Sequence, residues 1–587
     1  MIVSSPDWST RTFGNEERLP RVPVPTLEDS GRRFLEWCAP LLTPDELAET
    51  EAAVAEFLAP GSPAHELQAA LEEYDRSPGV HSWLDTFWPY RYLGRRDRIA
   101  LNANFFFLFQ DSPLGQVERA AELTASAVDY KLKLDEEQVP PVLLRDTPQS
   151  MVQHKYLFSA TRIPGQVLDT ARTPYREGWE GPSRERHIVV FHHDTPFRME
   201  VIGGDGRPYS PAQLAETLRA ILKDDHVAEV PPGHFTTKAR ADWADSRTAL
   251  LDAGNAAALE TIETALFCLC LDDFAPSDTL EASDRLLYGD NRWYDKAVSL
   301  IVFEDGTAGI NVEHCELDGT TILGFTDALL SGSRAEREPA SGVPGYEPVD
   351  FTLTDSLRED ALAAGIAFRA YADATATQTV SFGFGANRAK ELGMSPDAFA
   401  QMAYQLAHRR AKGLTGATYE SIATRQFRNG RTEAMRVVTP EVVRFADVLT
   451  DPAASAEEKR AAFRAAAAKH VARAKECQAG DAPEQHLWEL QLIGKRRGDT
   501  SEPALYSSPG WLKTRDDYLS TSSAPSVNIQ YFGFGSTSPQ CIGIAYVLLP
   551  DRWNIYLSTP KHVSAEMHRF ADELAVAVRE LQELLAE

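Results

Sequence analysis

The middle of the chain carries a pattern of apolar and polar positions that predicts a β-hairpin followed by a helix. Ala297–Phe303 is an apolar, β-branched run, Asp305-Gly306 is a tight-turn dipeptide, and Ala308–Val312 is a second apolar run. Apolar residues then recur at helical spacing from Thr321 to Leu330. We therefore expect a strand, a turn, a strand and a helix between residues 297 and 330.

Helix starts are signalled elsewhere by a serine or threonine placed directly before a proline. These two residues suit the N-cap and the first position of a helix. They predict helices over Pro44–Leu58, from Pro211 to about Leu222, and from Pro396 onward. Apolar runs predict strands at Ser526–Phe532, Cys541–Leu548 and Trp553–Leu557, and a closing helix at Ser564–Leu585. The three prolines between Leu19 and Leu27 favour an extended entry segment.

Length and charge narrow the possible classes of protein. The 587 residues suggest two to four domains, and 43% hydrophobic with 25% charged residues is an ordinary globular composition. A net charge of −27 argues against a nucleic acid or an anionic membrane as the main partner. No run reaches 18 apolar residues, and Met1–Pro20 has no basic, apolar leader, so we expect a soluble cytoplasmic protein.

The sequence offers no convincing metal site or disulfide framework. The six cysteines include no CxxC pair and are interpreted as reduced thiols. His192 and His193 adjoin Asp194, but neighbouring residues of a strand point to opposite faces, so we predict no shared ion there.

His314 is the main candidate for chemistry. It stands where the second strand of the hairpin stops, with Asp318 four positions later and a glycine that lets the chain bend. An imidazole supported by a carboxylate suits a general base, whereas a structural histidine is the plain alternative. Cys315 could be a nucleophile, but a small packing residue is the favoured interpretation.

The residues from His314 to Gly319 spell the HxxxDG signature of the chloramphenicol-acetyltransferase-like enzymes, which this segment resembles. With Asn291–Lys296 and the LPxxPxPxL spelling of Leu19–Leu27, the chain resembles the carnitine/choline acyltransferase family. Met151–Gly165 resembles its RIPG segment. The resemblance implies an α/β fold of two domains, each a mixed β-sheet with flanking helices, with an active-site tunnel at their interface. We expect an N-terminal strap over 1–89 that packs with the second domain, a catalytic-histidine domain over 90–350, and a donor/acceptor-binding domain over 351–587.

The same resemblance implies the catalytic groups. His314 would be the general base, and Ser522, from the Ser520-Thr521-Ser522 element, would donate a hydrogen bond to the oxyanion, without an acyl-enzyme. Arg96 would hold Asp318. Ser520 and Thr521 would line the substrate site.

Resemblance also implies where the thioester binds. Ser395 and Asp397 begin a helix beside the coenzyme A tunnel, and Lys390 with Arg388 would meet its 3′-phosphate. Ala386 stands where the family has another lysine, so this basic patch is thinned. The co-substrate would be acyl-CoA or an acyl carrier protein bearing phosphopantetheine, with no permanently bound cofactor.

The acceptor site departs from the family's carnitine pattern. Tyr419 and Thr432 match the residues that contact carnitine's carboxylate, but Gln485 replaces the expected arginine and Ala434 a threonine. A neutral amide cannot form the bidentate charged pair. Gln530, in the strand with Phe532, aligns with the position that limits acyl length and predicts a short or polar acyl group.

These observations predict an acyltransferase that moves a short or polar acyl group from a thioester to a hydroxyl or amine of a small acceptor lacking a carnitine-like carboxylate. A carnitine acyltransferase proper and a non-catalytic relative that binds acyl carriers are the alternatives. We expect a monomer.

Overall fold

The computed structural model describes residues 7–175 and 179–586 and divides the chain into two compact units. The first consists of Met1–Glu17, Trp88–Thr375 and Ser526–Gly535, and the second of Arg18–Phe87, Ala376–Pro525 and Ser536–Glu587. The described residues do not include Met1–Pro6, which is part of the Met1–Pro20 segment discussed above, or the final Glu587. Within the described residues, none of the helices combines the length and the apolar character that spanning a membrane requires.

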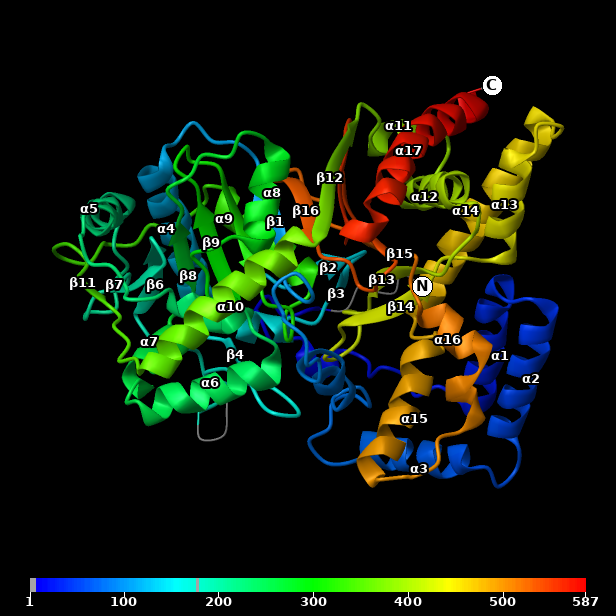
Figure 1. Ribbon diagram of the computed structural model, residues 1–587, viewed down its shortest axis with the longest axis horizontal. Coiled ribbons are helices and arrows are strands. Elements are labelled where there is room, and N and C mark those ends of the chain that lie inside the picture. The colour runs from blue at the N-terminus through cyan, green and yellow to red at the C-terminus, as the bar shows by residue number, and fades with distance from the viewer. Residues whose placement is uncertain (1–6, 176–178, 587) are drawn as a thin grey trace. The chain divides into compact units, whose positions relative to one another are not determined.

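The first unit is built on an eight-stranded mixed sheet with the strand order β11-β7-β6-β8-β9-β10-β1-β16 (Figure 1). Its strands are β1 Phe105–Phe109, β6 His187–His192, β7 Thr195–Glu200, β8 Cys268–Leu271, β9 Val298–Val302, β10 Ala308–Val312, β11 Tyr346–Pro348 and β16 Ile529–Phe534. Two short hairpins lie outside it: β2 Leu143–Leu144 with β3 Thr147–Pro148, and β4 Thr161–Ile163 with β5 Thr170–Arg172.

Helices pack on both central and edge strands of this sheet. Their bounds are α4 Gln116–Asp135, α5 Pro211–Leu222, α6 Arg240–Asp252, α7 Ala256–Thr264, α8 Thr279–Tyr288, α9 Gly319–Leu330 and α10 Asp355–Asp373. The short helices are η1 Glu16–Arg18, η3 Pro89–Leu93, η4 Val152–Tyr156 and η5 Pro232–Thr237. Helix α4 contacts β8 and β9, and α8 contacts β1, β10 and β16. All residues of β8, β9 and β10 are buried, and β9 and β10 correspond to the two predicted apolar runs.

The second unit contains a six-stranded mixed sheet with the order β12-β18-β17-β15-β13-β14. Its strands are β12 Thr375–Phe382, β13 Thr418–Ala423, β14 Thr432–Arg436, β15 Leu519–Ser523, β17 Ile542–Leu548 and β18 Trp553–Pro560. Helices α12 and α17 pack together over it, α17 touches β18, and α14 contacts β13 and β14. The helices are α1 Leu27–Cys38, α2 Pro44–Leu58, α3 Pro63–Asp75, α11 Ala386–Glu391, α12 Pro396–Lys412, α13 Pro440–Thr450, α14 Ala456–Gln478, α15 Glu484–Arg497, α16 Pro509–Arg515 and α17 Ser564–Ala586, with η2 Ala39–Leu41, η6 Ala504–Ser507 and η7 Lys561–Val563.

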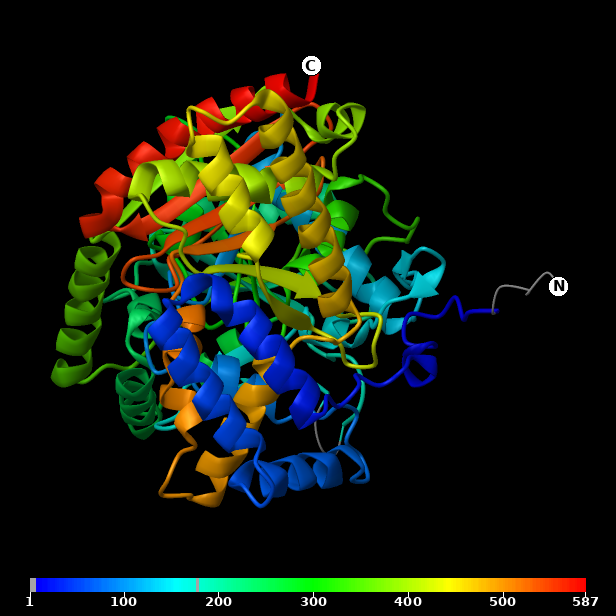
Figure 2. The ribbon, with the colours of Figure 1, turned by 90° about the vertical axis from the view of Figure 1, so that its right-hand side faces the viewer.

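The N-terminal helices belong to this second unit and pack against α15 and α16 (Figures 1 and 2). His486 on α15 joins them, because its Nδ1 lies 2.7 Å from the Ser30 hydroxyl and its Nε2 2.7 Å from the Gln68 side-chain oxygen. Burial lowers the pKa of His486 to about 3, so the imidazole is neutral and structural.

The predicted helix starts and the hairpin are confirmed. Thr43, Ser210 and Ser395 each accept a hydrogen bond from the first turn of α2, α5 and α12. β9 pairs with β10 in antiparallel register, and Gly306 takes the positive φ of 86° that the tight turn needs.

The division of the chain differs from the predicted one in three ways. The N-terminal segment up to Glu17 belongs to the first unit, not to a strap that packs with the second. The first unit extends to Thr375, rather than ending at 350, because α10 packs on η5 and α6. Residues 526–535 return to the first unit, because β16 pairs with β1 from Phe105↔Phe534 to Phe109↔Ile529.

The reason given for dismissing an ion at His192 and His193 is wrong. The two residues do not lie along one strand, since His193 and Asp194 form the turn between β6 and β7 with φ of 47° and 59°. Their rings stack with centroids 3.9 Å apart.

Candidate functional site

His314 follows β10 in the first unit, and its imidazole has one defined tautomer. Its Nδ1 lies 2.6 Å from the backbone oxygen of Leu317. A carbonyl oxygen only accepts, so Nδ1 must carry the hydrogen and Nε2 keeps its lone pair. The loop after β10 therefore presents an imidazole that is ready to take a proton at Nε2.

Aromatic rings hold the imidazole in place. The centroid of the Tyr92 ring lies 4.8 Å from that of His314, and Phe105 contacts it edge-on at 5.1 Å. The His314 side chain is 27% exposed, so a small reactant can still reach it. Its Nδ1 also lies 3.6 Å from Oδ1 of Asp318, a distance at which the carboxylate stabilises an imidazolium.

Asp318 is buried and is positioned by Gln153 of η4. The Gln153 amide nitrogen donates to Asp318 Oδ2 at 2.9 Å, and its oxygen accepts from the Asp318 backbone N–H at 2.9 Å. The same oxygen accepts from the Thr321 hydroxyl at 2.8 Å. Although Asp318 is the N-cap residue of α9, its side chain does not cap that helix.

Arg96 does not hold Asp318, so this prediction is wrong. Its guanidinium donates to the carbonyl oxygens of Leu93, Gly94 and Gly165 and to Oδ1 of Asp169 at 3.0 Å. The motif placed an arginine correctly beside this region, but the turn after η3 directs its side chain to Asp169.

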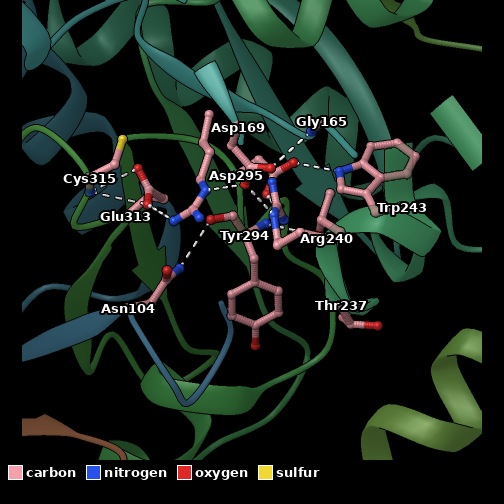
Figure 3. Close-up of polar contacts among 12 residues, drawn as sticks. Asn104, Gly165, Asp169, Thr237, Arg240, Trp243, Tyr294, Asp295, Glu313 and Cys315 are labelled. Carbon is pink, nitrogen blue, oxygen red and sulfur yellow. Dashed lines mark hydrogen bonds and ion pairs between the residues drawn. The ribbon is translucent and has the colours of Figure 1, made fainter. Parts of the chain in front are cut away.

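A buried ion network stabilises the strand end that carries His314 (Figure 3). Asp169 Oδ2 accepts from Arg162 at 2.6 Å and from Arg240 at 2.7 Å. Arg162 also donates to Glu313 at 3.2 Å, and Arg240 donates to Asp295 at 2.8 Å. The side chains of these five residues are at most 2% exposed, so their charges depend on one another for compensation.

The network sets the protonation of its members. Burial favours neutral Asp169, but Arg240 and Arg162 outweigh it and hold the pKa of that carboxyl below its usual value. Burial likewise opposes the charge of Arg162, yet Glu313 and Asp169 raise its pKa above normal. Glu313 in turn accepts the backbone N–H of Cys315, which places the residue after His314.

Cys315 is a packing residue. It is 6% exposed, and burial together with the charge of Glu313 raises the pKa of its thiol well above the ordinary value. A thiol of this kind stays protonated and is a poor nucleophile.

In the second unit, one face of the sheet gathers several of the predicted site residues. β13 and β15 run parallel with Tyr419 opposite Ser520, and side chains alternate along a strand. Tyr419, Ser520 and Ser522 therefore share one face. Ser522 is half-buried, and its hydroxyl has no partner within the described part of the chain.

Thr521 lies on the other face, which corrects its assignment to the substrate site. It is fully buried, donates to the Tyr419 carbonyl at 2.9 Å and accepts from Gln401 of α12 at 2.9 Å. Because side chains alternate along a strand, the middle residue of the Ser-Thr-Ser element faces the helices while the two serines face the other way. Thr521 thus fixes β15 and β13 to one another.

Thr432 and Ala434 share one face of β14, and Gln485 contacts Thr432. Gln485 at the start of α15 is 1% exposed and donates from its side-chain nitrogen to the Thr432 carbonyl at 2.9 Å. Among the described residues, the Gln485 side-chain oxygen and the Thr432 hydroxyl have no partner. Ala434, opposite Ser421, is fully buried on the same face.

Arg436 of β14, a cation on the same face as Ala434, is paired with two carboxyl groups. Arg436 of β14 makes two hydrogen bonds of 2.6 Å to Glu484 and another of 2.6 Å to Asp517. Its guanidinium also lies 5.6 Å from the Tyr419 ring centroid. Glu484 and Asp517 thus compensate the charge of Arg436, so this guanidinium is not available to pair with an anionic ligand.

The predicted phosphate-binding cations are only partly available. Arg388 donates to Gln582 at 3.3 Å and to Glu391 at 3.1 Å. Lys390 is exposed, and none of the residues that the structure describes forms an ion pair with it. Ser395 caps α12. The basic patch is therefore thin, and its role in binding a thioester donor stays a prediction.

Asp397 belongs to a cluster of acids that the sequence did not reveal. It accepts from the Tyr546 hydroxyl at 2.5 Å and lies 3.2 Å from Nε2 of His470, which is 3.3 Å from Glu420. Burial and the charge of Asp397 raise the pKa of Glu420 well above its usual value. Burial acts on Asp397 too, but His470 outweighs it and lowers that pKa, so Glu420 holds a proton beside an ionised Asp397.

Gln530 and Phe532 lie on β16 in the first unit. Gln530 donates to the Phe109 carbonyl at 2.8 Å and to Asp111 at 3.0 Å. The Phe532 ring contacts Phe107 at 5.4 Å and Phe105, the neighbour of His314, at 6.1 Å. The ring of Phe105 therefore lies between those of Phe532 and His314 and contacts both. The influence of Gln530 on acyl length stays a prediction.

The chain is similar to known proteins over nearly its whole length. The model of the family described as "Choline/Carnitine o-acyltransferase" matches residues 22–576. Mitochondrial carnitine O-palmitoyltransferase 2 of Rattus norvegicus is 31% identical over 92% of this chain and 88% of its own, and carnitine O-acetyltransferase of Columba livia is 30% identical over 97% and 94%. Among solved structures, a trichothecene 15-O-acetyltransferase of Fusarium sporotrichioides is 9% identical with a TM-score of 0.36, over 83% of this chain and 92% of its own. The match over nearly the whole chain shows that this protein is an acyltransferase of the choline/carnitine family.

Proposed function

We propose that the enzyme transfers a short or polar acyl group from acyl-CoA, or from an acyl carrier protein, to a hydroxyl or amine of a small acceptor without a carnitine-like carboxylate. The family uses acyl-CoA as its co-substrate. His314 Nε2 would take the acceptor's proton as it attacks the thioester and would return that proton to the departing thiolate. Ser522 would donate to the oxyanion.

The observation that carries the choice of acceptor is the neutral pair of Gln485 and Thr432. A carboxylate would need a cation or several donors, but Gln485 is neutral, uses one of its two amide hydrogens on the Thr432 carbonyl and leaves its own oxygen unpaired among the described residues. The guanidinium of Arg436 is already ion-paired with Glu484 and Asp517. Choline, an amino alcohol or an uncharged hydroxyl compound meets these groups without burying an unpaired negative charge.

A carnitine acyltransferase is the second candidate, and it is favoured by the names of the relatives that are 30–31% identical. Thiol release from acetyl-CoA with choline and, in parallel, with carnitine separates the two. Release with choline alone supports our proposal, and release with carnitine alone overturns it.

Exchange of Gln485 for arginine is expected to create or raise turnover with carnitine. The guanidinium would supply the bidentate, charge-assisted contact, which contributes about 1.5–3 kcal/mol per pair, or roughly a 10- to 100-fold gain in kcat/KM. Gln485→Met, of similar length but neutral, is the matched control and should gain nothing. An unchanged carnitine rate in a folded Gln485→Arg variant would contradict the role given to this residue.

Replacement of Ser522 by alanine is expected to lower kcat by about 10²–10³-fold with little change in KM, because the hydroxyl acts on the transition state. Ser523 is its exposed neighbour on the opposite face of β15. Ser523→Ala therefore serves as the control and should keep the wild-type rate. Equal rates of the two variants would remove Ser522 from the mechanism.

A further inference from the structure

The peptide group between Leu317 and Asp318 connects Gln153 to His314, the proposed base, by hydrogen bonds. The carbonyl of Leu317 and the N–H of Asp318 belong to the same planar peptide unit. That carbonyl accepts the Nδ1 hydrogen of His314, and that N–H donates to the side-chain oxygen of Gln153. Whatever fixes the plane of this peptide therefore also fixes the direction of the imidazole's hydrogen bond.

The side chain of Gln153 can fix the plane of this peptide. It is 3% exposed, and both ends of its amide are used: the oxygen accepts from Asp318 and Thr321, and the nitrogen donates to Asp318 Oδ2. Two donors on one side and a carboxylate on the other allow only one orientation of the amide. Gln153 thus holds the peptide and the carboxylate of Asp318 together.

We propose that Gln153 is a positioning residue that sets the tautomer and the orientation of His314 through the Leu317–Asp318 peptide and the Asp318 carboxylate. The inference rests on the proposed role of His314 as the base. Without Gln153, the peptide is free to turn, and the imidazole loses the acceptor that keeps its hydrogen on Nδ1. The Asp318 carboxylate also loses a neutral donor, so it compensates its charge more through His314 and favours the imidazolium.

The first test replaces Gln153 with methionine, which keeps the length of the side chain but not its hydrogen bonds. We expect kcat/KM to fall about 10- to 100-fold through kcat, because a misplaced base loses its alignment. The acid limb of the pH–rate profile should move to higher pH. Thr321→Val removes only the third bond to the amide and is the matched control, with a profile like that of the wild type.

A second measurement does not depend on turnover. Diethyl pyrocarbonate modifies unprotonated imidazole nitrogens, and mass spectrometry of the peptide that contains His314 follows the reaction at each pH. In Gln153→Met, the pH at which half of the maximal rate is reached should rise by about half a unit or more. An unchanged midpoint with a rate within twofold of wild type would overturn the proposal.

A double-mutant cycle keeps the two proposals apart. Asp318→Asn retains an oxygen for Gln153 but no charge, so Gln153→Met should have a smaller effect on kcat in this background than in the wild type. Additive effects contradict the inference about Gln153. If His314→Ala keeps its turnover, the proposed mechanism fails instead.

Discussion

His314→Ala is expected to lower the rate of acyl transfer by about 10²–10⁴-fold, because the variant lacks the imidazole nitrogen that takes the acceptor's proton. Thiol release from acetyl-CoA measures this loss. The imidazole donates a hydrogen bond to the Leu317 carbonyl and is partly exposed, so its removal should leave the fold intact.

A histidine outside the site provides the comparison. His568 is exposed on α17, where its Nδ1 lies 2.8 Å from the Gln378 side chain. His568→Ala should keep the wild-type rate. Partial recovery of His314→Ala by added imidazole would show that only the base is missing, whereas full activity without it would exclude His314 from proton transfer.

Asp169→Asn is expected to destabilise the first unit by about 3–5 kcal/mol, because it removes one partner from a buried ion network and leaves Arg162 and Arg240 undercompensated. The two units need not unfold together, so a single melting temperature is not sufficient. Hydrogen exchange of peptides that cover β9 and β10 reports on the strands beside the network.

An exposed aspartate provides the control for this prediction. Asp355 has a fully exposed side chain and pairs with Arg358 on α10. Asp355→Asn should change stability by less than about 1 kcal/mol. Similar losses for the two variants would mean that burial of the network contributes nothing.

Local pattern predicted much of this fold. The hairpin at His314 and the helix starts at Thr43, Ser210 and Ser395 rest on residues within one or two turns of each other, and these were confirmed. The predicted closing helix is also confirmed as α17, in which Met567, Phe570 and Leu574 are buried.

Contacts over long sequence distances could not be predicted in the same way. Arg96 was assigned to Asp318, but it binds Asp169, whose loop lies 73 residues further along the chain. Gln153 lies in the Met151–Gly165 stretch that resembles the RIPG segment, but no role was predicted for it, because its partners Asp318 and Thr321 are 165 and 168 residues away in sequence. Thr521 was grouped with its neighbours in sequence, although strand alternation turns it towards α12.

The return of β16 to the first unit has a consequence for synthesis on the ribosome. β1 is hydrogen-bonded to β10 on one side and to β16 on the other, yet β16 is translated about 150 residues after the first unit's main segment ends at Thr375. At typical elongation speeds this leaves the aromatic edge of β1 unpaired for roughly 10–30 s. A nascent chain that stalls in this interval would expose the unpaired edge of β1, which can pair with other chains. Chaperone binding should therefore be strongest before Phe534 emerges from the ribosome.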